Sequence, residues 1–204
     1  MDSVLEARLI ERASGGDAAA RDELFRAHLP RLTRMVELRL DPSLRRRLDP
    51  ADVVQDAWLE ASRRFAEWRA QTALPFHVWL RLLTGQALLT VHRRHLGAHK
   101  RDALRERHLA SGGPGVSATN VAEWFAASAT SPSQAVLRSE VRARVLTALE
   151  ELEELDREIL SLRHFEGLTN EEAAAELAIE PAAASKRFVR ALVRLRPALS
   201  ALAP

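Results

Sequence analysis

The sequence predicts an all-α protein made of two small helical domains that a flexible linker joins. Its composition is dominated by Ala, Leu, Arg and Glu, which favour helices, whereas aromatic residues make up only 5% and Tyr is absent. The chain has 204 residues, of which 47% are hydrophobic. This is enough apolar material for one medium-sized core or two small ones.

The first helical domain is expected over residues 1–108. From residue 20 to about residue 107, apolar residues recur at three- and four-residue steps, the spacing of successive amphipathic helices. One such stripe consists of Leu24, Phe25, His28, Leu32, Met35, Val36 and Leu40. The first turns carry Asp2, Glu6 and Arg8, and no run approaches the roughly 18 apolar residues that a membrane span needs. We therefore expect a cytoplasmic protein without membrane insertion.

The flexible linker is expected over residues 109–135, where Gly, Ser, Thr and Pro are concentrated. Its Gly-Gly-Pro-Gly stretch does not predict a phosphate-binding loop, because no Gly-Lys-Ser/Thr follows. Trp124 and Phe125 form a short apolar patch inside the linker. We expect this patch to dock on a surface that the sequence does not identify.

The second helical domain is expected over residues 136–204, and its end has a helix-turn-helix pattern. Gly167 is placed to end one helix, and the capping box Thr169-Asn-Glu-Glu172 starts the next. That helix breaks near residues 179–180, and Pro181 suits the first turn of a second helix because its missing N–H costs nothing there. In a DNA-binding helix-turn-helix the second helix enters the major groove.

The expected DNA contacts lie near the start of this second helix and one or two turns further on. They are Ala182, Ala183, Ser185, Lys186, Arg187, Arg190 and Arg194. Small residues allow a close approach, and Ser, Lys and Arg donate to bases and phosphates. An ordinary helical hairpin with a basic last turn is the alternative. Ala178 stands at a turn position that Gly often fills, where a left-handed backbone costs another residue about 1 kcal/mol or slightly more.

Charge is segregated along the chain, although the formal net charge is only +2. Residues 21–109 hold 18 Lys/Arg against 11 Asp/Glu, residues 150–180 hold 2 against 11, and residues 181–204 hold 5 against none. Basic blocks on helices are typical of nucleic-acid binding, and Arg-rich solvated faces are the alternative. The absence of Cys excludes disulfides, thiol nucleophiles, zinc fingers and iron–sulfur clusters.

Taken together, the motifs resemble those of bacterial sigma factors of the extracytoplasmic-function (ECF) subfamily. Three segments resemble region four, which reads the −35 element. They are Leu155-Asp-Arg-Glu-Ile-Leu160, Phe165-Glu-Gly-Leu-Thr-Asn-Glu-Glu-Ala173 and Ala184-Ser-Lys-Arg-Phe-Val-Arg-Ala-Leu192. Two segments resemble region two. They are Leu48-Asp-Pro-Ala-Asp-Val-Val-Gln-Asp-Ala57 and Pro75-Phe-His-Val-Trp-Leu80, and the second resembles the segment that opens the −10 element. The resemblance implies a region two domain over 1–108 and a region four domain over 136–204.

The resemblance also implies binding surfaces on the first domain. The polymerase clamp would bind Asp49, Asp52, Gln55 and Asp56. The alternative is that these residues simply form an acidic first turn, which the helix dipole favours. The loop from Phe65 to Phe76 would hold a swung-out −10 base, using aromatic surfaces and basic groups. The −10 contacts would be Phe65, Trp68, Arg69, Phe76, Gln86, Arg93, Arg94, Lys100 and Arg101. Alternatively, Phe76 and Trp79 could be buried in the hydrophobic core. We expect a core position for Trp79 and for Trp58.

The expected function is therefore a sigma factor that binds core RNA polymerase and promoter DNA. An anti-sigma factor is a further partner that the resemblance allows and the sequence does not identify. A stand-alone helix-turn-helix regulator is the alternative function. We expect no enzyme, because no nucleophile–base pair, phosphate loop or metal set is present. His92, His95 and His99 lie at helical spacing, but without Cys or an interleaved carboxylate they predict no metal site, and we expect no cofactor.

Overall fold

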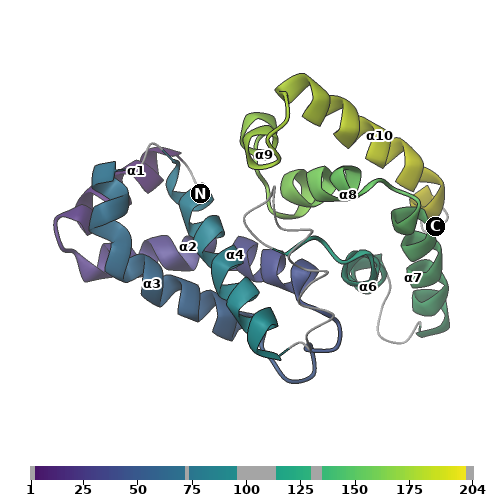
Figure 1. Cartoon of the computed structure of the whole chain (residues 1–204), viewed down its shortest axis with the longest axis horizontal. Helices are drawn as coiled ribbons and strands as arrows, with labels where there is room; N and C mark the ends of the chain where they lie inside the picture. Colours follow the sequence, from purple (N-terminus) through teal and green to yellow (C-terminus); the bar gives the residue numbers. More distant parts are fainter. Residues whose placement is uncertain (1–2, 72–73, 96–113, 130–134, 201–204) are drawn as a thin grey trace.

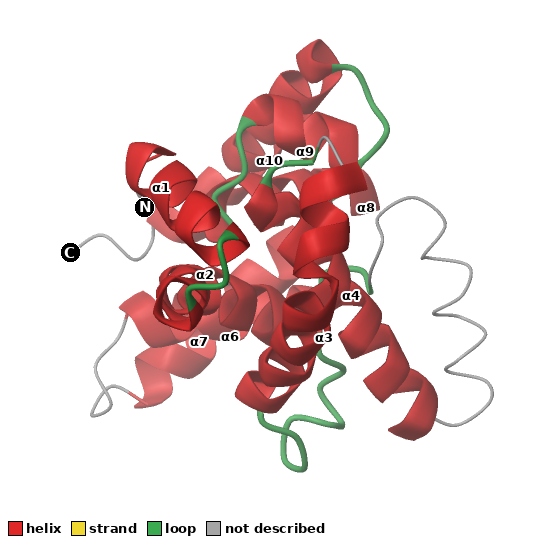
Figure 2. Cartoon of the chain, turned by 90° about the vertical axis from the view of Figure 1, so that its left-hand side faces the viewer, coloured by secondary structure: helices red, strands yellow, loops and turns green. Residues whose placement is uncertain are grey.

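The computed structural model describes residues 3–71, 74–95, 114–129 and 135–200. All regular structure within these ranges is helical, which confirms the all-α prediction (Figure 2). The helices are α1 (Ser3–Ser14), α2 (Ala18–Arg39), α3 (Pro50–Gln71), α4 (Phe76–His95), α6 (Ala118–Ala129), α7 (Ala135–Glu150), α8 (Glu154–Leu160), the π-helix η1 (Ser161–Phe165), α9 (Asn170–Glu176) and α10 (Pro181–Ser200). We refer to α1–α4 as the first half and to α6–α10 as the second half.

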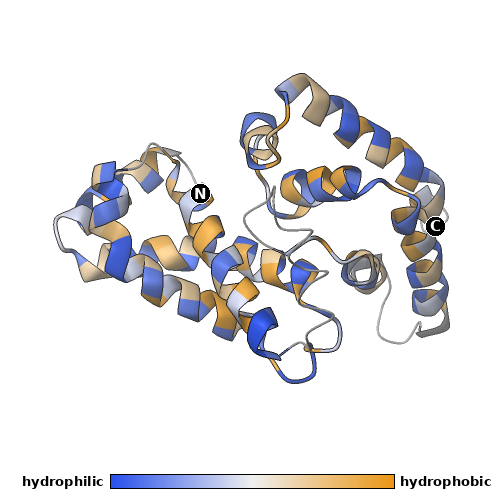
Figure 3. Cartoon of the chain, in the orientation of Figure 1, coloured by the Kyte–Doolittle hydropathy of each residue, from blue (hydrophilic) through white to orange (hydrophobic). Residues whose placement is uncertain are grey.

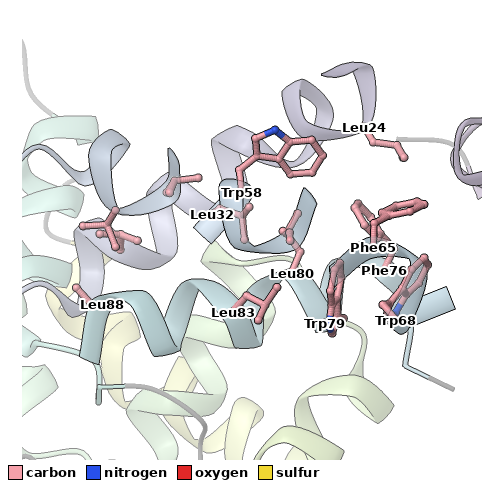
Figure 4. Close-up of a cluster of buried hydrophobic side chains, with 14 of the residues drawn as sticks. Leu24, Leu32, Trp58, Phe65, Trp68, Phe76, Trp79, Leu80, Leu83 and Leu88 are labelled. Carbon is pink, nitrogen blue, oxygen red and sulfur yellow. The ribbon is translucent and has the colours of Figure 1, made fainter. Parts of the chain in front are cut away.

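The first half has a hydrophobic core between α2, α3 and α4, on the left of Figure 1. The predicted stripe on α2 faces this core, and Leu24 and Val36 are fully buried. At one end, four aromatic rings pack against one another: Phe65, Trp68, Phe76 and Trp79 (Figure 4). Trp58 is buried and stacks on Phe25 with 4.7 Å between ring centroids. The core positions predicted for Trp58 and Trp79 are thus confirmed.

The second half has two smaller cores. One lies between α6, α7, α8 and α10 and contains Val145, Leu149 and Leu195, and the other lies beneath α9 and contains Leu162 and Ala173. Helices in both halves carry hydrophobic and hydrophilic residues on different faces, as the amphipathic spacing predicts (Figure 3). The second half is therefore a helical unit in which the last helix packs across several earlier ones.

Part of the expected linker is a helix and not a flexible segment. Helix α6 lies within residues 109–135 and begins just after the Gly-rich stretch. The buried side-chain amide of Asn120 donates to the carbonyls of Glu37 and Leu40 and so caps the end of α2. Trp124 and Phe125 pack on the ring of Phe165, which identifies the surface for the predicted apolar patch. Tertiary contacts thus stabilise α6 as a helix although the sequence on both sides of it has the composition of a linker.

Candidate nucleic-acid interface

The helix-turn-helix forms as the capping motif predicts. The hydroxyl of Thr169 accepts from the backbone N–H of Glu172, and the Glu172 carboxylate accepts from the backbone N–H of Thr169. This reciprocal pair begins α9. At the turn, Ala178 has a φ of 52°, the left-handed conformation that usually favours glycine. Helix α10 then begins at Pro181, as expected.

The start of α10 presents a small, polar surface. Ala182, Ser185 and Lys186 are exposed, Ala183 is half-buried, and Arg194 is exposed two turns further on. Ala184 and Ala191 face inward and are fully buried. A helix with small residues at its exposed N-terminal end can approach a groove closely, and nearby donors can reach base edges or phosphates.

Arg187 and Arg190 turn back toward α8. The Arg190 guanidinium donates Nε–H and Nη2–H to the two oxygens of Asp156 at 2.7 Å each, and Arg187 Nη1 lies 2.8 Å from Asp156 Oδ1. The exposed Glu153 accepts from both arginines. We call these four residues the internal network, because both helices belong to the second half. These two arginines therefore already have carboxylate partners.

The acidic surface of the first half lies on α3. Asp52, Gln55 and Asp56 are all exposed, while Val53 and Val54 on the opposite face are buried. Asp49 precedes the helix, where its carboxylate accepts from the backbone N–H of Ala51 at 2.9 Å. Leu59 is exposed one turn beyond Asp56. This polar face with one apolar residue at its edge is available for a partner.

Several residues expected to contact −10 DNA lie inside the core. Helix α3 continues through Gln71, so the segment that was expected to be a loop from Phe65 is helical for most of its length. Phe65, Trp68 and Phe76 are buried, and the indole N–H of Trp68 donates to the carbonyl of Leu74. The aromatic cluster that forms the core explains this, because burying such large rings is strongly favourable. In this conformation these rings cannot stack on a base.

The remaining expected −10 contacts fall into two groups. Arg69 near the end of α3, and Gln86, Arg93 and Arg94 along α4, are exposed. Lys100 and Arg101 lie outside the described residues. Helix α4 therefore presents polar and basic groups along its outer face, whereas the aromatic rings at its beginning are part of the core.

A buried ionic network, which no sequence pattern predicts, joins the two halves. Arg39 of α2 donates to Glu158 at 2.9 Å and also to Glu166. Arg81 of α4 donates from Nε to Glu166 at 2.7 Å and from Nη1 to Glu176 at 2.6 Å. These five side chains are between 1% and 6% exposed. We call them the seam network.

Further hydrogen bonds complete the bonding around the seam network. Ser161 donates to Glu166 Oε1 at 2.9 Å, and the backbone N–H of Val116 donates to Glu158 Oε1. Arg31 of α2 donates to the backbone carbonyls of Glu166, at 2.8 Å, and of Gly167. Buried charges are tolerable when they are paired and hydrogen-bonded in this way.

The seam network shifts the pKa values of its carboxyl groups in opposite directions. Burial tends to raise the pKa of Glu166, but the positive charges of Arg39 and Arg81 prevail and lower it to about 2. Burial raises the pKa of Glu176, because it outweighs the attraction of Arg81. Glu166 is thus held firmly as a carboxylate at neutral pH, whereas the desolvation of Glu176 is not fully offset by its arginine partner.

The described residues contain no group of three or more His, Asp or Glu that could hold a metal ion. His92 is buried, and its Nε2 accepts from the backbone N–H of Asp41 at 3.2 Å. His99 lies outside the described residues. Within the described ranges, no helix is long and apolar enough to cross a membrane.

Comparisons with known proteins extend along nearly the whole chain. A family model described as "ECF sigma factor" matches residues 4–200. The ECF RNA polymerase sigma-E factor of Escherichia coli strain K12 is 28% identical over 186 residues, which cover 90% of this chain and 88% of that protein. The RNA polymerase sigma-H factor of Pseudomonas aeruginosa is 27% identical over 200 residues, covering 96% and 94%.

A solved structure shares the fold. It is the structure of CnrH in complex with the cytosolic domain of CnrY, and the match has a TM-score of 0.55 and 21% identity. The match covers 97% of this chain and 98% of that one. The similarity therefore includes both halves.

Proposed function

The chain belongs to the ECF sigma factor family, and on this premise we propose that it binds core RNA polymerase and directs it to promoters. The observation that carries the proposal is the family match over residues 4–200, which includes both the acidic face of α3 and the helix-turn-helix. The curated relatives have similar lengths and are named as polymerase sigma factors. A stand-alone helix-turn-helix regulator is not favoured, because the match extends through the first half.

We propose a division of labour between the two halves. The exposed face of α3, with Asp52, Gln55 and Asp56, binds the polymerase clamp, and Asp49 lies beside it. The start of α10 binds −35 DNA through Ser185, Lys186 and the neighbouring small residues. Arg187 and Arg190 can reach phosphates only by leaving Asp156, whereas Lys186 and Arg194 are exposed.

In the first half, we propose that −10 DNA follows the outer face of α4. Gln86, Arg93 and Arg94 are exposed there, and Arg69 extends the basic surface from the end of α3. Two modest DNA contacts on one chain reinforce each other, because binding of one raises the effective concentration of the other. We infer that the protein acts by binding and not by catalysis, in the cytoplasm where RNA polymerase works. An anti-sigma factor would be an additional partner.

Run-off transcription with purified core polymerase, followed by mapping of the start sites, tests the proposed function. We expect transcripts whose start sites share upstream elements, and weak DNA binding in gel shifts without core enzyme. Tight binding to duplex DNA without polymerase would instead favour a stand-alone regulator. Failure to bind core polymerase, or to initiate from any genomic promoter, would refute the proposal.

Two variants separate the surfaces. Replacing Asp52 and Asp56 with Asn should weaken polymerase binding and leave the fold intact, because both side chains are exposed. Lys186→Ala should weaken promoter binding by the holoenzyme without changing its affinity for core polymerase. Glu23→Gln, at an exposed position on α2, is the matched control for a lost carboxylate.

A further inference from the structure

Two arginines of the helix expected to bind −35 DNA share one buried acceptor. Helix α8 packs against α10 in the second half (Figure 1), and the side chain of Asp156 on α8 is fully buried between the two helices. Both of its oxygens accept from Arg190, and Oδ1 also accepts from Arg187. Asp156 therefore binds two cations of α10 at once.

The internal network carries no net charge at neutral pH. Burial tends to raise the pKa of Asp156, but the hydrogen bonds from Arg190 and Arg187 prevail and lower it. Asp156 is thus ionised. The exposed carboxylate of Glu153 accepts from the same two arginines. Two carboxylates therefore balance two guanidinium groups.

Helix α10 consequently offers less positive charge to DNA than its sequence indicates. Residues 181–204 hold five Lys/Arg and no Asp/Glu. Arg187 and Arg190 belong to the internal network, whereas Lys186, Arg194 and Arg196 are exposed. Sequence-independent binding depends on how many phosphates the cations of a protein neutralise. We therefore expect only three of the five cations to contribute to it.

Arg187 and Arg190 do not exchange Asp156 for a phosphate at little cost. When they leave, they strip a buried carboxylate of its partners, and its burial prevents full hydration. A phosphate contact at the surface of the duplex is partly screened by solvent and salt. The exchange is therefore unfavourable unless other contacts already hold α10 in the groove.

We propose that Asp156 is a specificity-determining residue, which withholds Arg187 and Arg190 from the phosphates of non-promoter DNA. Asp156 acts through the two arginines and does not itself contact DNA. Discrimination then depends on the exposed surface at the start of α10, with Ser185 and Lys186. The consequence rests on the proposed function, because a promoter-binding protein must reject a large excess of other sequences.

The test measures binding of the full-length protein to a fluorescein-labelled duplex of mixed sequence without a promoter. Fluorescence anisotropy at several KCl concentrations gives the slope of log affinity against log salt concentration. Asp156→Asn keeps the size of the side chain and removes its charge. Glu151→Gln is the matched control, because it removes the same charge from an exposed position between α7 and α8, outside the internal network.

We expect Asp156→Asn to steepen the salt slope by up to about two, since each further phosphate that is neutralised contributes about 0.9. Affinity for the non-promoter duplex should rise about tenfold at low salt, whereas Glu151→Gln should match the parent protein. Glu153→Gln should act in the same direction but less strongly, because Asp156 remains. Since Glu153 is exposed, this variant also tests the proposal if Asp156→Asn fails to fold.

A triple variant separates the charge of the arginines from a structural role of Asp156. Adding Arg187→Gln and Arg190→Gln to Asp156→Asn removes the released cations, so the salt slope should return close to that of the parent protein. A steep slope that persists in the triple variant would overturn the proposal. So would a slope that matches the parent protein in both Asp156→Asn and Glu153→Gln. Circular dichroism and thermal unfolding check that each variant is folded.

Run-off transcription by the holoenzyme measures specificity itself. With an excess of non-promoter competitor DNA, Asp156→Asn should lose more product than the parent protein and Glu151→Gln. Equal sensitivity to the competitor would overturn the role of Asp156 in specificity, even with normal transcription. A steeper salt slope in a protein that never initiates transcription would instead overturn the proposed function, while Asp156 would still withhold the arginines from phosphates.

Discussion

The seam network and the internal network use the same chemistry in different surroundings. In the seam network, Arg39 and Arg81 are 1% and 5% exposed and meet carboxylates of the other half. In the internal network, Arg187 and Arg190 are 25% and 41% exposed and pair with α8 of their own half. Water can therefore hydrate Arg187 and Arg190 if they lose their partner, although the Asp156 carboxylate between them is buried, whereas water cannot reach Arg39 or Arg81.

Burial therefore determines how strongly an ion pair constrains the molecule. A buried charge without its partner is costly, whereas a partly exposed charge is screened by solvent. The seam network should therefore control whether the halves stay together, and the internal network should mainly orient α10 on α8. Each of the following variants tests one side of this contrast.

The largest effect is expected for Arg39→Met. This change keeps the apolar volume but leaves Glu158 and Glu166 without one of their cations, which should cost about 3–5 kcal/mol of stability. Urea unfolding followed by tryptophan fluorescence measures the loss. Arg190→Met is the matched control on the exposed side, and an equal loss in both variants would contradict the contrast.

A pH dependence should distinguish Glu166 from a neutral residue at the same position. The pKa of Glu166 falls from 4.5 to about 2 in the folded protein, so its contribution is fully present above about pH 4.5 and is lost as the pH falls toward 2. The shift corresponds to about 3 kcal/mol. The stability difference between the parent protein and Glu166→Gln should shrink over this interval. A difference that stays constant down to pH 2 would refute the assignment.

Gly167→Ala should destabilise the seam by about 2 kcal/mol. Gly167 has a φ of +67°, and an added Cβ would lie 2.7 Å from Nη2 of Arg31, whose guanidinium donates to the carbonyls of residues 166 and 167. Thermal unfolding and the distance between fluorescent labels on the two halves both report this change. If only the melting temperature falls and the halves stay together, backbone strain alone accounts for the effect.

The smallest effect is expected within the second half, for Ala178→Gly. The left-handed φ of 52° costs Ala about 1 kcal/mol, which Gly relieves, although the greater freedom of Gly in the unfolded chain offsets part of the gain. Stability should rise by less than about 1 kcal/mol without any change in the distance between halves. A calorimetric scan of the parent and the variant measures it. A lower melting temperature would contradict the interpretation of this turn.

Much of the fold was predictable because its signals are local. The capping box at Thr169, the start of α10 at Pro181 and the left-handed turn at Ala178 each depend on residues a few positions apart. Trp58 and Trp79 were expected to lie in the core, and both are buried there. Helix α6 was missed because Gly- and Pro-rich segments surround it, and its stability depends on Asn120 and Trp124 contacting distant residues.

The candidate site was predictable only in part. Exposure of Asp52, Ser185 and Lys186 agrees with the expected surfaces, but their binding partners remain predictions. Phe65, Trp68 and Phe76 were expected to bind a base, and the structure buries them. The same aromatic spacing suits a stacking surface and a core, so only the neighbours of these rings decide between the two uses.

The residues alone predict a helical protein with a helix-turn-helix and with opposite charge in successive blocks. What those charges contact depends on how the helices pack. Arg31, Arg39 and Arg81 belong to the first basic block, and their partners belong to the acidic block, more than eighty residues away in the chain. The position of a charge in the sequence does not show which way its side chain points. Whether it faces solvent, nucleic acid or another part of the same chain is known only once the helices pack.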